Sequence, residues 1–165
     1  EVTALDVSEA RLARLAENLA RCGLAAEVVA ADALDWRPPE PFDAILLDAP
    51  CSATGTIRRH PELPHRREAP DLARLTALQD ALLARAWGWL RPGGRLVYAV
   101  CSLLPEEGET RAAAFAAAHP EARAIAPEGP LAPFARGAGL VTRPDLWPEI
   151  GGMDGFFAAG FVKEA

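Results

Sequence analysis

The chain has 165 residues, of which 50% are hydrophobic and 24% charged, a composition typical of a single globular domain, 1–165, with a hydrophobic core. No apolar run reaches the roughly 20 residues that a membrane span needs, and the start lacks a signal-peptide pattern, so we expect a cytoplasmic protein without membrane contact. The net charge of −6 provides no general attraction to nucleic acid, so RNA binding would require a local basic patch.

The first half of the chain alternates between strand and helix patterns. A strand-like run opens the sequence, and an amphipathic helix follows that starts at Ser8 and ends at Gly23. A second short strand is predicted at 26–32, and prolines mark the loop before the apolar run FDAILLD at 42–48. Such a nearly continuous apolar run is typical of a strand that is buried on both faces.

The second half continues the alternation. Leucines at helical spacing predict a helix from about 70 to 90 with RPGG as its stop, and RLVYAVC at 95–101 is another buried strand. The segment 105–120 predicts a helix with Pro105 and acidic residues in its first turn. The proline-rich, glycine-rich segment 121–150 has no clear pattern, and 154–163 resembles a last strand for which an antiparallel edge position is considered.

Alternating apolar strands and helices predict an α/β fold with a mostly parallel, doubly wound sheet and helices on both faces. Ligands of such sheets bind beyond the carboxyl ends of the strands. The candidate site residues at strand ends are therefore Asp6, Asp32, Asp48, Cys51 and Cys101.

The strand-end acids permit two interpretations. Asp6 is where nucleotide-binding folds place an acid that accepts hydrogen bonds from ribose, yet it could equally cap the next helix, although Ser8 is closer to the helix start. Asp32 could bind a ligand or simply begin a turn. Taken with Asp48, the ordered set indicates acids that surround one ligand. The printed sequence has no GxGxxG loop that would cradle a phosphate group.

The chain's three cysteines are an odd number, so reduced thiols are expected, and the lack of a CxxC pair argues against a structural zinc site. Cys22 lies late in a helix and is interpreted as a buried or neutral thiol. Cys51 and Cys101 each follow a strand, and consecutive strands are often neighbours, so both thiols could face one pocket. A nucleophilic thiolate requires a positive neighbour or a helix N-terminus.

The segments DAPCSATGTIRRHPE and AVCSLLPEEGE resemble the two signature motifs of the RNA cytosine-carbon-5 methyltransferases, in particular the bacterial Sun/Fmu type that acts on ribosomal RNA. The segment ALDVSEARLARLAENLARCGL and the terminal MDGFF resemble the same family. The resemblance covers nearly all of the chain except 121–150. It implies a Rossmann-like fold that uses S-adenosylmethionine, with no metal, and it leaves protein partners unknown.

The resemblance also implies residue roles. Asp6 would bind the ribose of the cofactor, Asp32 would lie near the adenine, and Asp48 would lie near the methionine end and the target base. Cys101 would be the catalytic nucleophile, and Cys51 would assist product release. Basic residues near the first motif would contact RNA phosphates; they are Arg58, Arg59 and His60, with Arg66 and Arg67 either sharing this role or forming a solvated charge run.

The family's first strand and glycine-rich loop, and its usual N-terminal RNA-binding extension, have no counterpart in the printed sequence. We therefore expect a truncated methyltransferase domain that lacks the strand between those of Asp6 and Asp48. Two alternatives remain open. One is an inactive RNA-binding remnant, and the other is a related methyltransferase that acts on transfer RNA or DNA.

Overall fold

The computed structural model describes residues 1–66 and 71–164. The chain divides into two compact units, Glu1–Pro39 and Glu40–Ala165, which are considered separately below. Whether they form the single domain expected from the sequence stays a prediction.

The smaller unit is a strand, a helix and a second strand. β1 (Thr3–Asp6) and β2 (Glu27–Ala30) pair in parallel, so that Asp6 lies beside Ala30, and α1 (Glu9–Cys22) connects them. The Ser8 side chain caps the start of α1 by accepting from the Arg11 amide. Gly23 ends the helix in the left-handed conformation with a φ of 65°. Both predicted helix boundaries are therefore confirmed.

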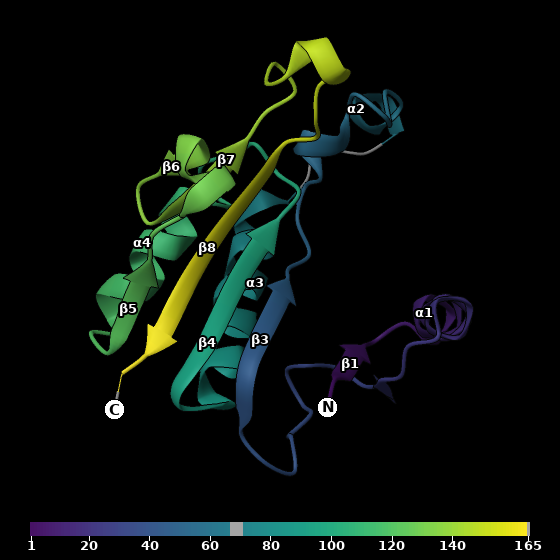
Figure 1. The fold of residues 1–165 in the computed structure, drawn as a ribbon, viewed down its shortest axis with the longest axis vertical. Coiled ribbons are helices and arrows are strands. Elements are labelled where there is room, and N and C mark those ends of the chain that lie inside the picture. The colour runs from purple at the N-terminus through teal and green to yellow at the C-terminus, as the bar shows by residue number, and fades with distance from the viewer. Residues whose placement is uncertain (67–70, 165) are drawn as a thin grey trace. The chain divides into compact units, whose positions relative to one another are not determined.

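Three long strands form the centre of the larger unit (Figure 1). β3 (Phe42–Asp48) pairs in parallel with β4 (Leu90–Val100), and β4 pairs in antiparallel with β8 (Phe156–Lys163). The antiparallel direction of the last strand is therefore confirmed. The RPGG segment lies within β4, because Gly93 in the left-handed conformation and a register irregularity let the strand begin earlier than predicted.

The segment left unassigned from the sequence adds three short strands: β5 (Ala122–Ile125), β6 (Ala135–Arg136) and β7 (Gly139–Thr142). β5 and β7 both pair in antiparallel with β8, and β6 pairs in antiparallel with β7. The sheet is consequently mixed rather than mostly parallel. β8 is also not an edge strand, since it has partners along both sides.

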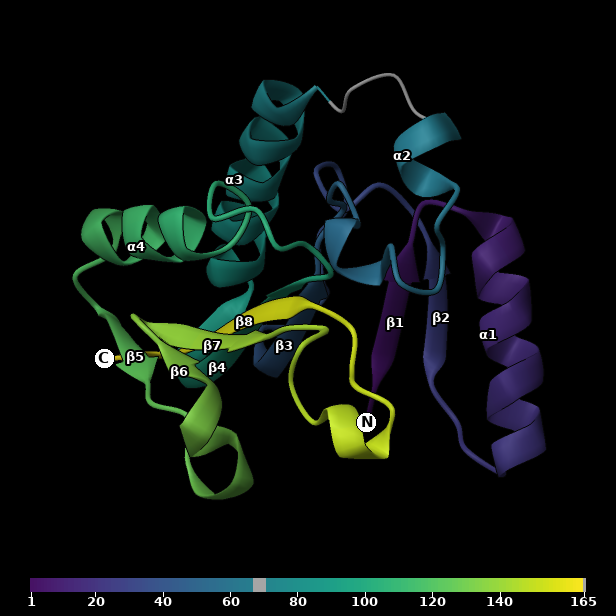
Figure 2. The same cartoon turned by 90° about the horizontal axis from the view of Figure 1, so that it is seen from above.

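Three α-helices lie within the described residues of the larger unit: α2 (Leu63–Arg66), α3 (Leu72–Gly88) and α4 (Glu109–Ala118). Short 3₁₀ turns occur at Thr54–Thr56, Gly129–Phe134 and Pro148–Ile150. Figure 2 shows α3 and α4 on the same face of the sheet. α4 begins four residues later than predicted, because 105–108 form a turn in which the Glu107 and Gly108 amides donate to the Leu104 carbonyl.

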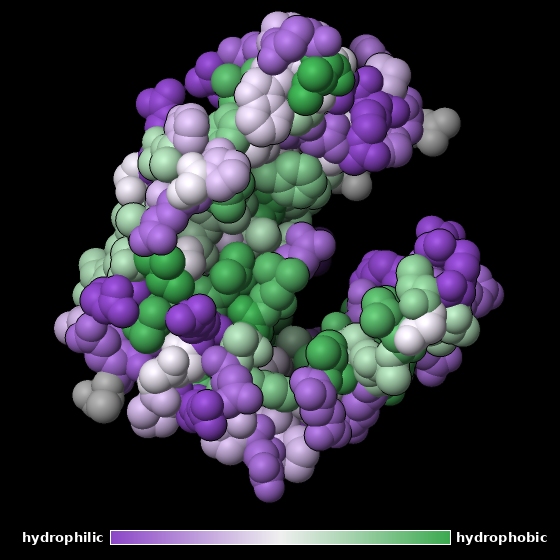
Figure 3. Space-filling view, in the orientation of Figure 1, coloured by the Kyte–Doolittle hydropathy of each residue, from purple (hydrophilic) through white to green (hydrophobic). Residues whose placement is uncertain are grey.

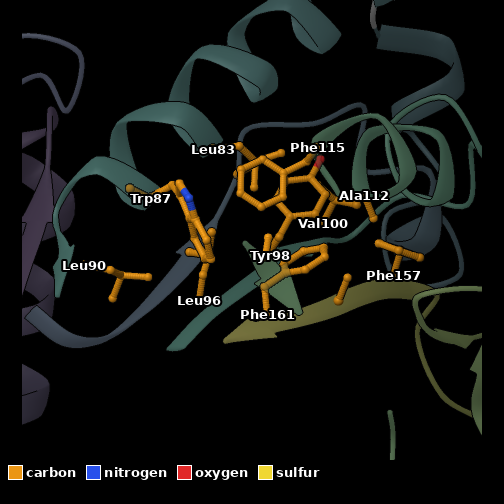
Figure 4. Packing of buried hydrophobic residues seen from close by; sticks show 14 residues of the cluster. Leu83, Trp87, Leu90, Leu96, Tyr98, Val100, Ala112, Phe115, Phe157 and Phe161 are labelled. Atoms are coloured by element: carbon orange, nitrogen blue, oxygen red, sulfur yellow. The ribbon is translucent and has the colours of Figure 1, made fainter. Parts of the chain in front are cut away.

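The hydrophobic core lies between the sheet and these two helices (Figure 4). Alternate residues of each strand point toward the helices, as the two-residue period of a strand requires. Tyr98, Leu96 and Phe161 are fully buried there, and Trp87 of α3 packs edge-on against Phe115 of α4. This packing holds β3 and β4 in place, and the candidate site lies at the carboxyl ends of these two strands.

The opposite face of the sheet is open in the larger unit. It carries a hollow of about 530 Å³ whose lining includes Val97, Gly160 and Val162, and Figure 3 shows hydrophobic surface on this side. β3 is not buried on both faces as predicted: Leu47 packs against the core, but the Leu46 side chain is 71% exposed, because only one face of β3 meets the core cluster. Among the described helices, none is long and apolar enough to cross a membrane.

Candidate active site

The sulfur atoms of Cys51 and Cys101 lie 3.4 Å apart at the carboxyl ends of β3 and β4. Cys101 directly follows β4, and Cys51 lies three residues beyond Asp48, the last residue of β3. The Ala49 amide extends the pairing by donating to the Ala99 carbonyl. Parallel pairing therefore brings both thiols to one point, as the strand order predicted.

The two thiols differ in acidity. The hydrogen bond from Cys51 lowers the pKa of Cys101 from 9.0 to about 7, although burial and the charge of Asp48 oppose this effect. The same contact with Cys101, together with burial, raises the pKa of Cys51 well above its ordinary value. Near neutral pH, Cys51 therefore keeps its proton, and Cys101 is the thiol of the pair that begins to ionise. The Cys51 thiol thus stabilises the Cys101 thiolate, a role that was expected of a positive neighbour or a helix N-terminus.

Asp48 belongs to the same end of the sheet. It is the last residue of β3 and pairs with Ala99, two residues before Cys101. Its side chain is exposed, and its charge is close enough to act on the Cys101 thiol. The structure thus brings together three of the predicted residues, two thiols and a carboxylate.

Two glycines allow three loops to meet at this point. The Gly55 amide donates to the Cys101 carbonyl, and the Gly155 amide donates to the Gly55 carbonyl. A Cβ atom on Gly55 would lie 1.8 Å from the Gly155 oxygen, and one on Gly155 would lie 2.5 Å from a Leu103 methyl carbon. Only residues without a side chain fit here. Both glycines lie within the motifs that resemble the family, but the sequence pattern alone does not indicate this role.

A buried polar cluster includes the residues that follow the two cysteines, Ser52 and Ser102, and the sequence pattern did not predict it. The fully buried carboxylate of Glu107 accepts hydrogen bonds from the Ser52 amide at 2.9 Å and from Gln79 at 3.1 Å. The Ser52 hydroxyl also donates to it and contacts the Ser102 hydroxyl. The only sequence signal was the motif PEEGE, which does not indicate which acid is buried.

The predicted RNA-binding residues lie on the loop that follows Cys51. Arg59 forms an ion pair with Asp154, and Arg58 donates to the Gly151 carbonyl. His60 lies 3.6 Å from Glu62 and is half exposed. The two arginine contacts join the loop to the segment before β8. Arg66 ends α2, and Arg67 lies outside the described residues.

Asp6 and Asp32 lie in the smaller unit and already have partners there. Asp6 accepts two hydrogen bonds from Arg11 and one from the Ser8 amide, and the bond to Arg11 lowers its pKa. Asp32 accepts from the Leu34 amide, which forms the turn considered above. Both carboxylates stand at strand ends as predicted, while their ligand roles stay predictions.

Residues 1–162 match the sequence model of the family described as 16S rRNA methyltransferase RsmB/F. The chain belongs to this family. It is 45% identical over 166 aligned residues to ribosomal RNA small subunit methyltransferase B of Klebsiella pneumoniae, and 42% identical over 167 to the protein of that name from Vibrio cholerae. Each alignment covers 99% of this chain and 36% of the relative, so the chain spans about a third of these relatives. The resemblance drawn from the motifs is confirmed.

Solved structures agree with the family and the fold. The crystal structure of NSun6 from Pyrococcus horikoshii with SFG has a TM-score of 0.78 and 29% identity, covering 100% of this chain and 42% of its own. A methyltransferase homolog protein from the same organism has a TM-score of 0.73 and 31% identity, covering 98% of this chain and 52% of its own. These similarities support the Rossmann-like methyltransferase fold expected from the sequence.

Proposed function

We propose that this chain is the catalytic part of an enzyme that transfers a methyl group from S-adenosylmethionine to carbon 5 of a cytosine in RNA. Ribosomal RNA in the cytoplasm is the proposed substrate, as the names of the relatives suggest. The observation that carries the proposal is the contact between the Cys51 and Cys101 sulfurs, with the Cys101 thiol acidified.

The chemistry begins with the Cys101 thiolate. Carbon 5 of cytosine is a poor nucleophile, so the thiolate adds to carbon 6, and the electrons of the ring double bond move toward carbon 5 and ring nitrogen 3. Asp48 would share a proton with ring nitrogen 3 and stabilise the charge that develops there. Its place at the end of β3 suits this role, because its charge already acts on the Cys101 sulfur.

The proposed role of Cys51 follows from its changed surroundings in the adduct. Before reaction it donates a hydrogen bond to the Cys101 sulfur, which is the main cause of its high pKa. Once that sulfur is bonded to carbon 6 and uncharged, this cause is lost, so Cys51 becomes easier to ionise. Cys51, or a water that it positions, can then remove the carbon 5 proton. The ring double bond re-forms, and the Cys101 thiolate leaves.

The cofactor supplies an electrophilic methyl group. Among the chain's own residues, Asp6 would accept hydrogen bonds from its ribose hydroxyls and Asp32 from its adenine. The carboxylates fit this role as acceptors, because a carboxylate has about four acceptor positions and Asp32 uses one of them for the Leu34 amide. Asp6 already accepts three hydrogen bonds, which leaves about one acceptor position. Two of the three come from Arg11, whose side chain is 67% exposed. NSun6 with SFG supports a cofactor site of this kind.

The target cytosine would have to be unstacked for a thiolate to reach carbon 6. Arg58, Arg59 and His60 are proposed to hold the flanking phosphates, since their side chains are at least partly exposed on the loop after Cys51. Their number is small, in agreement with the acidic net charge of the chain.

The proposal is tested with protein expressed from the complete gene, tritiated S-adenosylmethionine and ribosomal RNA. Replacing Cys101 by alanine should abolish methylation, whereas Cys51→Ala should form a denaturation-resistant adduct between protein and RNA. Cys22→Ala is the matched control, because this thiol is exposed on α1 and not buried as the sequence pattern suggested.

Each variant can also contradict the proposal. Normal methylation by Cys101→Ala would exclude Cys101 as the nucleophile. An RNA adduct on Cys51 instead of Cys101 would favour the alternative of a DNA-type methyltransferase. If wild-type protein neither methylates RNA nor binds the cofactor in calorimetry, the inactive RNA-binding remnant is the better description.

A further inference from the structure

Glu107 is a buried charge that the proposed chemistry does not use. Its side chain is fully inaccessible to solvent, and its carboxylate accepts from the Ser52 amide, the Ser52 hydroxyl and Gln79. Burying a carboxylate is costly unless its oxygens are hydrogen-bonded. Such a group is therefore expected to hold its donors in place strongly.

The donors to Glu107 lie immediately around Cys51. Gln79 of α3 is also fully buried and donates both to Glu107 and to the Pro50 carbonyl, at 2.9 Å. The Ser52 amide, on the other side of Cys51, donates to Glu107. Both peptide groups that flank the Cys51 side chain are thus held by one pair of buried side chains.

The same glutamate is anchored to the strand that leads to Cys101. The Tyr98 hydroxyl donates to the Glu107 carbonyl, and Tyr98 is a fully buried residue of β4, three positions before Cys101. The Ser102 hydroxyl, next to Cys101, contacts the Ser52 hydroxyl at 3.1 Å. Glu107 therefore joins the backbone around Cys51 to the strand that carries Cys101.

We propose that Glu107, together with Gln79, is a positioning residue that holds the Cys51 sulfur against the Cys101 sulfur. This inference rests on the proposed function for its catalytic meaning, since it is there that the two thiols act in sequence. It does not require Glu107 to touch RNA or cofactor. The distance between the sulfurs is the quantity that Glu107 controls.

The rate at which the two thiols join in a disulfide measures this positioning without RNA or cofactor. In the reaction each thiol loses a proton and an electron, and the N=N bond of the azo oxidant diamide takes up both electrons and both protons to become a hydrazine. Glu107→Ala should slow the reaction about tenfold or more, because small displacements of reacting groups have effects of this size. Loss of the Glu107 charge alone would speed the reaction, because this charge raises the pKa of both thiols and its loss would leave more thiolate.

The assay uses protein from the complete gene with Cys22→Ala as background. The oxidation rate of Glu107→Gln should lie between those of the wild type and Glu107→Ala, because the glutamine keeps an oxygen that can accept from the Ser52 amide. Glu106→Ala is the matched control, since this neighbouring carboxylate is exposed. Leu83→Ala controls for lost stability, as it opens the core on α3 without removing a contact of Glu107. If Glu107→Ala does not fold, Ser52→Ala removes one of the same hydrogen bonds and should slow the reaction by a smaller factor.

The outcomes separate the two proposals. Slow oxidation in Glu107→Ala, with normal oxidation in Glu106→Ala and Leu83→Ala, supports positioning even if the wild-type protein methylates no RNA. Equal slowing in Leu83→Ala, or no slowing in Glu107→Ala and Ser52→Ala, overturns it. Where methylation is active, Glu107→Ala should also accumulate the RNA adduct and lower kcat more than it changes KM.

Discussion

The Cys51 sulfur lies 3.4 Å from the Cys101 sulfur, although 50 positions separate the residues in the chain. The contact makes the two thiols unequal, because a proton shared between them stabilises one thiolate and suppresses the other. In this chain the favoured thiolate is Cys101.

Removal of the Cys51 thiol should raise the pKa of Cys101. The hydrogen bond from Cys51 is the largest cause that lowers this pKa to about 7, and burial and Asp48 then remain to raise it. In a Cys22→Ala background, alkylation of Cys101 by iodoacetamide near neutral pH should slow about tenfold in Cys51→Ala. The alkylation rate in Cys51→Ser should lie between those of the wild type and Cys51→Ala, since the serine hydroxyl can still donate a hydrogen bond to the Cys101 sulfur. An unchanged pH profile of alkylation in Cys51→Ala would refute this account.

Mild oxidation should inactivate the protein reversibly. The two sulfurs are already in contact, so a small approach would form a disulfide, with two protons and two electrons passed to the oxidant. Methylation should be lost and then recovered with dithiothreitol, and mass spectrometry should identify the peptide pair. In Cys51→Ala, formation of the RNA adduct should survive the same treatment. Equal, reversible loss in that variant would show that another group is oxidised.

Gly55→Ala should destabilise the larger unit. The added methyl group would lie 1.8 Å from the Gly155 oxygen, so one of the two loops must move. We expect the free energy of unfolding in urea to fall by about 1–3 kcal/mol. Gly88→Ala is the control, because nothing lies within 4 Å of its added Cβ at the end of α3, and it should raise stability by about 0.5 kcal/mol. Similar stabilities of the two variants would contradict the close approach of these loops.

Arg59→Ala should weaken RNA binding and reduce its dependence on salt. Loss of one phosphate contact lowers the slope of log K against log salt concentration by about 1. The matched control is Arg123→Ala, which removes a similarly exposed arginine of β5 that forms an ion pair with Glu164. Filter binding across a salt series distinguishes the two. Equal slopes for both variants would mean that Arg59 serves only its ion pair with Asp154.

Local features of the sequence predicted most elements, because their causes are local. Ser8 and Gly23 bound α1 through contacts within one helical turn, and the apolar runs marked β3 and β4. The segment 121–150 could not be assigned, because its strands are short and two of them, β5 and β7, pair with β8, which follows them in the chain. The sequence pattern likewise could not reveal that β8 lies inside the sheet, because this depends on its pairing with β5 and β7.

The amino-acid sequence by itself determined the family, the strand ends and the identity of the two thiols, because motif residues and apolar periodicity are properties of neighbouring positions. Only the tertiary structure decided which thiol is acidic and what holds the pair together. The pKa of Cys101 depends on a hydrogen bond across two strands, and the selection of Glu107 over Glu106 depends on which carboxylate is buried against Ser52. Such differences arise from distance in space and from desolvation, which a linear pattern does not contain.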